Sequence, residues 1–288
     1  IVRRNGGALV GLASQNQGVR CMTGSHEKNR RYWDASAPGW ERLRDRDGLW
    51  QTCHENPEPA FEGRALETIR SLVGGLAGKD VCVIGSGDNY AAFALAGLGA
   101  KVTSTDISRG QLAVAESRAS LLGLDIDFVR SDAAHLDSLP DQSFDLICST
   151  NGFFTWIAEP ALVLAEVHRL LRPGGFYVFY DVHPFQRPWQ DQVGETRMDK
   201  PYWDTGPHGS KGDIPTVEFE WTVADLLNAL AESGLRLKTI IESPAKDSRF
   251  WEGHSYEPGS HPELLDWKVN PRAGLPVWLT VAAQKAEA

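Results

Sequence analysis

The 288-residue chain has no long apolar run, no run of basic residues and no closely spaced pair of cysteines. Gly, Pro or a charged residue interrupts every apolar stretch, so none reaches the roughly 20 residues that cross a bilayer, and no membrane partner is predicted. The net charge of −9 without clustered Lys and Arg argues against a nucleic-acid partner. The four cysteines lack CxxC spacing, which favours reduced thiols and a cytoplasmic protein.

The first 24 residues are polar, Gly-rich and without hydrophobic periodicity. We expect them to form a flexible tail, with the native start near the first methionine, Met22. The apolar patch at residues 8–13 is shorter than a typical signal-peptide core, so a secretion signal is not expected.

Residues 25–288 are predicted to form one domain, which begins with a helical cap at 25–75. The cap contains the aromatic residues Tyr32, Trp33 and Trp40. They would either cover a ligand or pack the cap onto the domain, and the sequence leaves both alternatives open.

The most informative segment is Val81-Cys-Val-Ile-Gly85-Ser86-Gly87, a β-favouring apolar run that ends on two glycines. The helical pattern of residues 91–96 follows at once, which is typical of the first half of a nucleotide-binding βαβ unit. A second strand, 101–105, ends at Asp106, where a carboxylate can accept hydrogen bonds from ribose hydroxyls. Gly-x-Gly alone more often marks a tight turn, so the spacing to Asp106 carries the prediction of a nucleoside site.

The residues around the two glycines disfavour a pyrophosphate. A dinucleotide site would have a third glycine where this chain has Tyr90, and Asp88 would repel phosphate at the helix start. A ligand with ribose and adenine but no phosphate therefore fits better.

Strands and helices alternate beyond Asp106 with short connections, which indicates a mainly parallel sheet with helices on both faces. The predicted strands are 126–129, 144–149, 176–180, 235–242 and 276–283, and the helices are 108–122, 160–171 and 222–233. Too little chain follows the last strand for a crossover helix, so it should pair antiparallel. The predicted fold is an α/β, Rossmann-like, doubly wound seven-stranded sheet.

Two spans, 184–215 and 243–275, lack periodicity and are rich in Trp, Tyr and His. Irregular spans of this length are often functional, so we expect them to lie on the substrate side. Their aromatic residues would either wall the acceptor site or pin the loops to the domain. Their histidines share no metal-ligand spacing with a carboxylate or thiol, so no metal is predicted.

Four blocks together resemble the class I S-adenosylmethionine-dependent methyltransferases, in particular the small-molecule group that includes the ubiquinone-biosynthesis type. The blocks are Val83-Ile-Gly-Ser-Gly87, Thr105-Asp-Ile-Ser108, Ser131-Asp-Ala-Ala134 and Leu170-Leu-Arg-Pro-Gly-Gly175. Their order and spacing are specific, although no single block is. The resemblance covers roughly residues 27–285.

The resemblance implies S-adenosyl-L-methionine as the methyl donor and assigns residues to its parts. Asp106 would hold the ribose, Asp132 and the Ala133 amide the adenine edge, and Ile107 the adenine face. The remaining implied cofactor residues are Gly85, Ser86, Gly87, Ser149, Thr150 and Tyr32. One departure is Val83, which stands where the family usually has a carboxylate; Asp88 would either compensate or merely favour the helix dipole.

Methyl transfer needs alignment of a nucleophile more than a base. His183 is the preferred base if the acceptor must lose a proton, the alternative being a structural turn at His183-Pro184. Asn151 would orient the acceptor. We expect transfer to oxygen or nitrogen of a small molecule, with carbon left open, and a homodimer is also left open. The rival functions are a nicotinamide-dependent oxidoreductase and a non-catalytic binding protein on the same fold.

Overall fold

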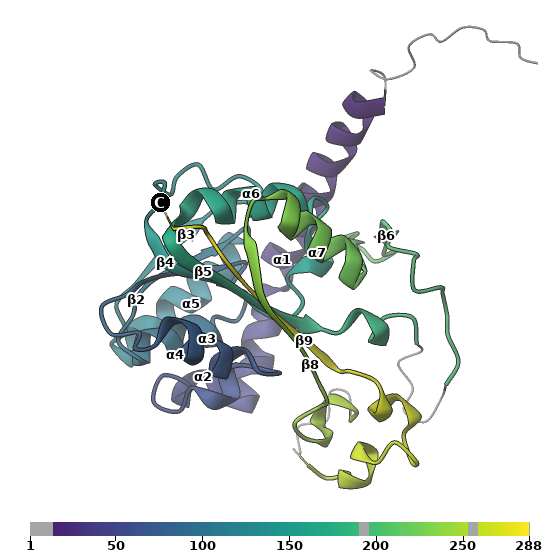
Figure 1. Cartoon of the computed structure of the whole chain (residues 1–288). Helices are drawn as coiled ribbons and strands as arrows, with labels where there is room; N and C mark the ends of the chain where they lie inside the picture. The colour runs from purple at the N-terminus through teal and green to yellow at the C-terminus, as the bar shows by residue number, and fades with distance from the viewer. Residues whose placement is uncertain (1–13, 190–195, 253–258, 288) are drawn as a thin grey trace, which may run out of the picture.

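A seven-stranded sheet with the strand order β3-β2-β1-β4-β5-β9-β8 forms the centre of the computed structural model (Figure 1). The structure describes residues 14–189, 196–252 and 259–287, with side chains from residue 24 onward. The strands are β1 (Asp80–Ile84), β2 (Lys101–Asp106), β3 (Ile126–Arg130), β4 (Phe144–Ser149), β5 (Leu171–Val182), β8 (Arg236–Ser243) and β9 (Trp278–Gln284).

Strands β1 to β5 run parallel, and β9 pairs antiparallel with both β5 and β8. This confirms the predicted fold class, including the antiparallel last strand. The order reverses between β1 and β4, and ligands of open α/β sheets bind at such a switch point, beyond the carboxyl ends of the strands.

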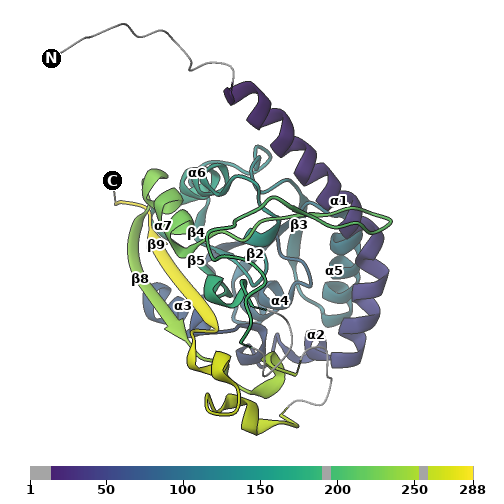
Figure 2. The same ribbon diagram turned by 90° about the vertical axis from the view of Figure 1, so that its right-hand side faces the viewer.

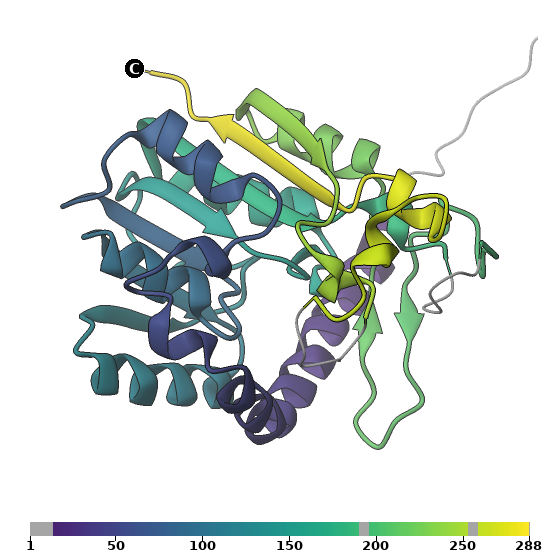
Figure 3. The same cartoon turned by 90° about the horizontal axis from the view of Figure 1, so that it is seen from below.

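Helices cover both faces of the sheet, as Figure 2 and Figure 3 show. Their bounds are α3 (Ala65–Val73), α4 (Tyr90–Gly97), α5 (Arg109–Leu122), α6 (Pro160–Leu170) and α7 (Val223–Glu232). Alternate β1 residues serve opposite faces: Val81 and Val83 pack in one core with α3, α4 and α5, whereas Cys82 and Ile84 pack in a second core with α6 and α7. A strand buried on both faces reads as a continuous apolar run, which is why β1 was evident from sequence.

Helix α1 (Ser14–Asp47) is far longer than the sequence pattern suggested. Residues 14–24, which the sequence assigned to a tail, belong to this helix, and residues 1–13 lie outside the described part of the chain. The helix passes beside α5 (Figure 2), where the Asp34 carboxylate accepts hydrogen bonds from the Ser108 hydroxyl and the Gly110 amide at 2.8 and 3.2 Å. The short helix α2 (Leu49–Thr52) follows it.

The described parts of the two irregular spans hold only short elements. A two-stranded ribbon, which the sequence did not predict, pairs β6 (His208–Gly209) of the first span with β7 (Val217–Glu218), which directly follows that span. The described parts of the spans also contain short 3-10 helices: η3 (Pro184–Gln186) in the first, and η4 (Ser248–Phe250), η5 (Pro262–Leu265) and η6 (Pro271–Gly274) in the second. Two further 3-10 helices lie outside the spans: η1 (Glu58–Ala60) between α2 and α3, and η2 (Phe154–Trp156) between β4 and α6. Within the described residues, no helix combines the length and apolar character needed to span a bilayer.

Candidate functional site

A cavity of about 820 Å³ opens beyond the carboxyl ends of β1, β2 and β4. Its wall is formed by the turns that follow these strands, by α1, and by the segment between α2 and α3. Because β1 and β4 flank the reversal in strand order, the cavity occupies the place expected for a ligand in this architecture.

The turn after β1 forms the floor of the cavity. Gly85 and Gly87 have φ of +59° and +52°, a left-handed conformation that strains any residue with a Cβ atom. A Cβ on Gly85 would also lie 2.4 Å from the Phe153 ring. The turn is fixed from below by Ser86, whose amide donates to the Thr105 carbonyl at 2.9 Å. Predicted residues Gly85, Ser86 and Gly87 all line the cavity.

Asp106 ends β2 beside this turn and is 7 % exposed. One carboxylate oxygen accepts the Gly87 amide at 3.0 Å and the other the Ser108 amide at 2.8 Å. Burial raises the pKa of Asp106, and the two amide hydrogen bonds oppose that rise. Each oxygen keeps a second lone pair, so a rigidly held acceptor faces the cavity.

Asp132 lines the cavity after β3 and is held by a residue that the sequence did not single out. The Ala158 amide donates to Nε2 of His26 at 3.1 Å, so the ring proton is on Nδ1, which donates to Asp132 Oδ2 at 2.8 Å. The other oxygen accepts the Ala134 amide at 3.0 Å. Burial would raise the pKa of Asp132, but the hydrogen bonds from His26 and from the Ala134 amide outweigh it and the pKa is lowered.

A charged cluster borders the two-glycine turn. Arg44 of α1 forms ion pairs with Asp88 at 2.9 Å and with Asp47 at 3.2 Å, and its guanidinium lies over the Trp40 and Tyr90 rings. All five residues line the cavity. Asp88 therefore forms an ion pair with Arg44 in addition to its position at the start of α4.

Val83 is fully buried and packs in the same hydrophobic core as Tyr90. An apolar side chain thus occupies the position where the family resemblance would place a carboxylate. The charged side chains near the turn come instead from α1 and from the start of α4.

The other predicted cofactor residues divide into two groups. Ile107, Ala133, Thr150 and Asn151 line the cavity. The Ser149 and Tyr32 side chains are not among the lining residues, so they do not fit the predicted role: Ser149 Oγ is buried against the Tyr177 hydroxyl at 2.7 Å, and Tyr32 stacks on Trp156. Side chains alternate along β4, so Ser149 faces the core although it ends the strand.

The structure does not support His183 as a base. Its ring is fully buried and is not among the residues that line the cavity. Nδ1 accepts the Phe185 amide at 3.1 Å and Nε2 lies 2.9 Å from Glu242 Oε1, so both nitrogens have partners. Burial lowers the pKa of His183, and Glu242 opposes this shift. The alternative of a structural turn at His183-Pro184 agrees with this geometry.

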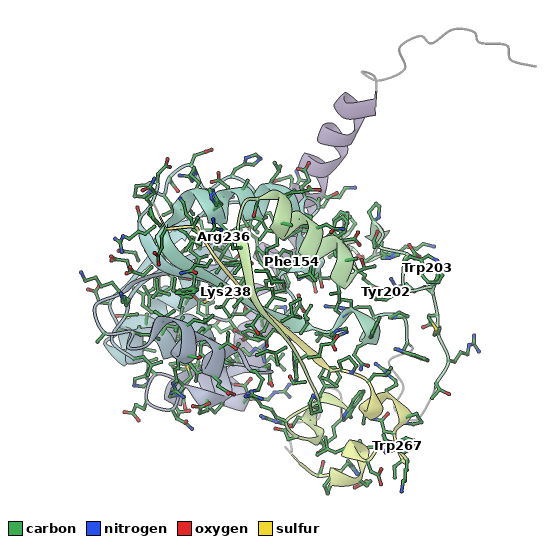
Figure 4. The ribbon with its side chains drawn as sticks, in the orientation of Figure 1. Phe154, Tyr202, Trp203, Arg236, Lys238 and Trp267 are labelled. Carbon is green, nitrogen blue, oxygen red and sulfur yellow. The ribbon has the colours of Figure 1, made fainter. Side chains whose placement is uncertain are left out.

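The irregular spans contribute little to the cavity. Of their described residues, Arg249 is the one that lines it. Tyr202, Trp203 and Trp267 lie at the outer margin of the molecule (Figure 4), and Trp203 is 78 % exposed. Residues 254 and 256 lie outside the described part of the chain. The described aromatic residues of these spans therefore do not form the acceptor wall.

The side of the cavity away from Asp106 and Asp132 is built by residues that the sequence reasoning missed. Glu62, between η1 and α3, lines this side together with Tyr180 at the end of β5 and Trp278 at the start of β9. Tyr180 and Trp278 are adjacent to predicted strand ends, which is a usable signal. Glu62 and His26 had none, because each is a single polar residue in a segment far from the strands. Among the described residues, no three His, Cys, Asp or Glu side chains gather to form a metal site.

Comparison with known proteins agrees with the family resemblance found in the sequence. A family model described as a methyltransferase domain matches residues 82–179. A ubiquinone biosynthesis O-methyltransferase from Nitrosococcus oceani is 34 % identical over 136 residues, which cover 47 % of this chain and 54 % of that protein. One from Pseudoalteromonas translucida is 28 % identical and covers 68 % of this chain and 80 % of that protein. The chain thus spans about half the length of the first of these relatives.

Among solved structures, an S-adenosylmethionine-dependent methyltransferase from Mesorhizobium loti is similar with a TM-score of 0.57 and 25 % identity. The similarity covers 77 % of this chain and 98 % of that one.

Proposed function

Since this chain belongs to the class I S-adenosylmethionine-dependent methyltransferases, we propose that it transfers the methyl group of S-adenosylmethionine to a hydroxyl oxygen of a small molecule. The observation that carries the proposal is the buried Asp106 carboxylate, held by two backbone amides and facing the cavity beside the Gly85–Gly87 turn. Oxygen is favoured as the acceptor atom because the similar relatives are O-methyltransferases.

The residues of the cavity fit this donor. Asp106 would accept the ribose hydroxyls, and Asp132, fixed by His26, would accept the adenine amino group. Arg44 and Asp88 offer opposite charges next to the turn, which suits the carboxylate and ammonium of the methionine part. Pockets for drug-sized ligands measure roughly 300–1,000 Å³, so a cavity of about 820 Å³ leaves space for an acceptor beside the donor.

A nicotinamide dinucleotide fits less well. Its pyrophosphate would lie at the two-glycine turn, where Asp88 lines the cavity and Tyr90 replaces the glycine that packs helix against strand. A carboxylate at this point repels phosphate. The same charge is compatible with an ammonium group.

The sulfonium carbon of the donor is already activated, so the protein's contribution is alignment and exclusion of water. Thr150 and Asn151 lie at the cavity after β4, and Asn151 Oδ1 is fixed by the Val182 amide at 3.2 Å. The rings of Trp33, Trp40, Tyr180 and Trp278 supply apolar surface around the two ligands. Donor and acceptor would meet between these two groups of residues.

Titration calorimetry with S-adenosylhomocysteine and with NAD tests the donor assignment. We expect the thioether to bind and NAD not to bind; tight NAD binding without any response to S-adenosylhomocysteine would contradict the proposal. Detection of S-adenosylhomocysteine release with a panel of phenols, catechols and aliphatic alcohols tests the reaction. Binding without turnover across hydroxyl, amine and thiol acceptors would favour the non-catalytic alternative.

A further inference from the structure

The backbone around Glu62 is held in one place from both sides. Phe61, 1 % exposed, packs against the Tyr180 ring at 6.1 Å, and its carbonyl accepts the Lys246 ammonium at 2.6 Å. Gly63 has φ of +57°, and a Cβ there would lie 2.9 Å from Thr280 Oγ1. Glu62 is therefore presented to the cavity from a segment fixed against β5 and β9.

The Glu62 carboxylate differs from the other carboxylates of the cavity. Asp106 and Asp132 each accept a backbone amide, and Asp47 accepts the Tyr90 hydroxyl. Asp88 is paired with Arg44. Within the described parts of the chain, Glu62 has nearby charges but no hydrogen-bond donor. A half-buried carboxylate without a donor is unfavourable unless a ligand supplies one.

From this placement we propose that Glu62 is the general base that takes the proton of the acceptor hydroxyl. The inference rests on the proposed methyl transfer. The hydroxyl oxygen forms the new bond to the methyl carbon, and the electron pair of the broken carbon–sulfur bond passes to sulfur. The hydroxyl proton passes to a Glu62 oxygen and then to solvent. The neighbouring Tyr180 and Trp278 rings favour a planar, phenolic acceptor.

The surroundings of Glu62 suit this role. Burial raises the pKa of Glu62, whereas Lys246 and Arg249 oppose the rise and Asp247 adds to it. A raised pKa makes the carboxylate a stronger base. Since the ionised form is the active one, turnover should increase as the pH rises through this pKa.

The test compares Glu62→Gln, Glu62→Asp and the wild type with catechol and with 4-nitrocatechol, whose more acidic hydroxyl is ionised near neutral pH. With catechol, we expect Glu62→Gln to lower kcat roughly 10²–10⁴-fold, the range for loss of a general base, and Glu62→Asp to lower it less. With 4-nitrocatechol, the loss should shrink towards none. Glu58→Gln is the matched control, because Glu58 lies on the same segment but is exposed and outside the cavity lining.

Further readouts separate the possibilities. Unchanged calorimetric affinity for S-adenosylhomocysteine in Glu62→Gln, together with loss of the acidic limb of the kcat–pH profile, supports the inference. An equal loss with both catechols, or a raised KM with unchanged kcat, overturns it, as does a wild type that binds S-adenosylhomocysteine but methylates no hydroxyl compound. A wild type that does not bind S-adenosylhomocysteine refutes instead the proposed function.

Discussion

Replacing Asp106 with alanine should abolish recognition of the ribose. The carboxylate is 7 % exposed and its two oxygens are already aligned by the Gly87 and Ser108 amides. A ribose that donates two hydroxyls to it would gain charge-assisted hydrogen bonds without any reorganisation of the side chain. Loss of such a partner costs about 1–3 kcal/mol, which is roughly a 5- to 150-fold loss of affinity.

The same substitution should also destabilise the fold. Ser108 is fully buried and caps α5, with its Oγ accepting the Gln111 amide at 3.2 Å. Removal of the carboxylate leaves the Ser108 and Gly87 amides without a partner, at a cost of about 1–3 kcal/mol for each that stays buried and dry. Weakened binding alone would therefore not distinguish ribose recognition from a distorted turn.

A pair of ligands resolves this ambiguity. Calorimetry of adenosine and 2′,3′-dideoxyadenosine measures the contribution of the two hydroxyls within each protein, so any distortion of the turn affects both ligands. We expect the wild type to prefer adenosine and Asp106→Ala to lose that preference, while Asp125→Ala, at an exposed position outside the cavity lining, keeps it. If a folded Asp106→Ala protein retained the wild-type preference, the ribose assignment would be wrong.

Three further changes test other parts of the structure. His26→Ala should reduce the preference for adenosine over inosine by about 1 kcal/mol, because Asp132 loses the donor that orients it. Competition binding measures this preference, and an unchanged value would show that His26 does not position Asp132. Gly85→Ala should lower the unfolding free energy by about 1–3 kcal/mol, since the new methyl would lie 2.4 Å from the Phe153 ring; denaturant titration checks it, and wild-type stability would show that the ring moves freely. Burial lowers the pKa of His183 in the folded protein, so the unfolded chain binds the proton more readily. Stability should therefore fall as the pH drops below 6.5, the ordinary pKa of histidine, by at most about 1.4 kcal/mol per pH unit. His183→Gln should flatten this part of the pH–stability curve and leave kcat near that of the wild type, whereas a selective loss of kcat would restore His183 as a base.

The sheet could be predicted because its signals are local. Strands β1 and β4 are buried on both faces, so each contains an uninterrupted stretch of three or four apolar residues followed by a turn signal. Helix α5 was located by its Ser108 cap and by Gly123, whose φ of +66° ends the helix. Helix α1 was predicted to start too late, because its first turns carry no apolar stripe to distinguish a helix from a polar tail.

The candidate site could be predicted only where it follows strand ends. Asp106 ends β2 and Asp132 follows the end of the adjacent strand β3, so the sheet brings them to the same edge. Ser149 and His183 also follow strand ends, but the side chain of the first faces the core and the ring of the second is buried with both nitrogens bonded. Sequence position indicates which end of the sheet a residue occupies but not the direction of its side chain.

The charge of the cavity affects how strongly it binds the methyl donor and the product. Of the described residues that line it, five carry a carboxylate and three a guanidinium, so acidic groups are in excess. S-adenosylmethionine has a sulfonium charge that the thioether product lacks, and opposite charges attract more strongly in a partly desolvated site than in water. Methyl transfer removes the positive charge at the moment when Glu62, if it is the base, takes up a proton and loses its negative charge. The two changes offset each other in net charge, but the attraction between the sulfonium and the acidic groups is lost, so the product should bind more weakly than the donor.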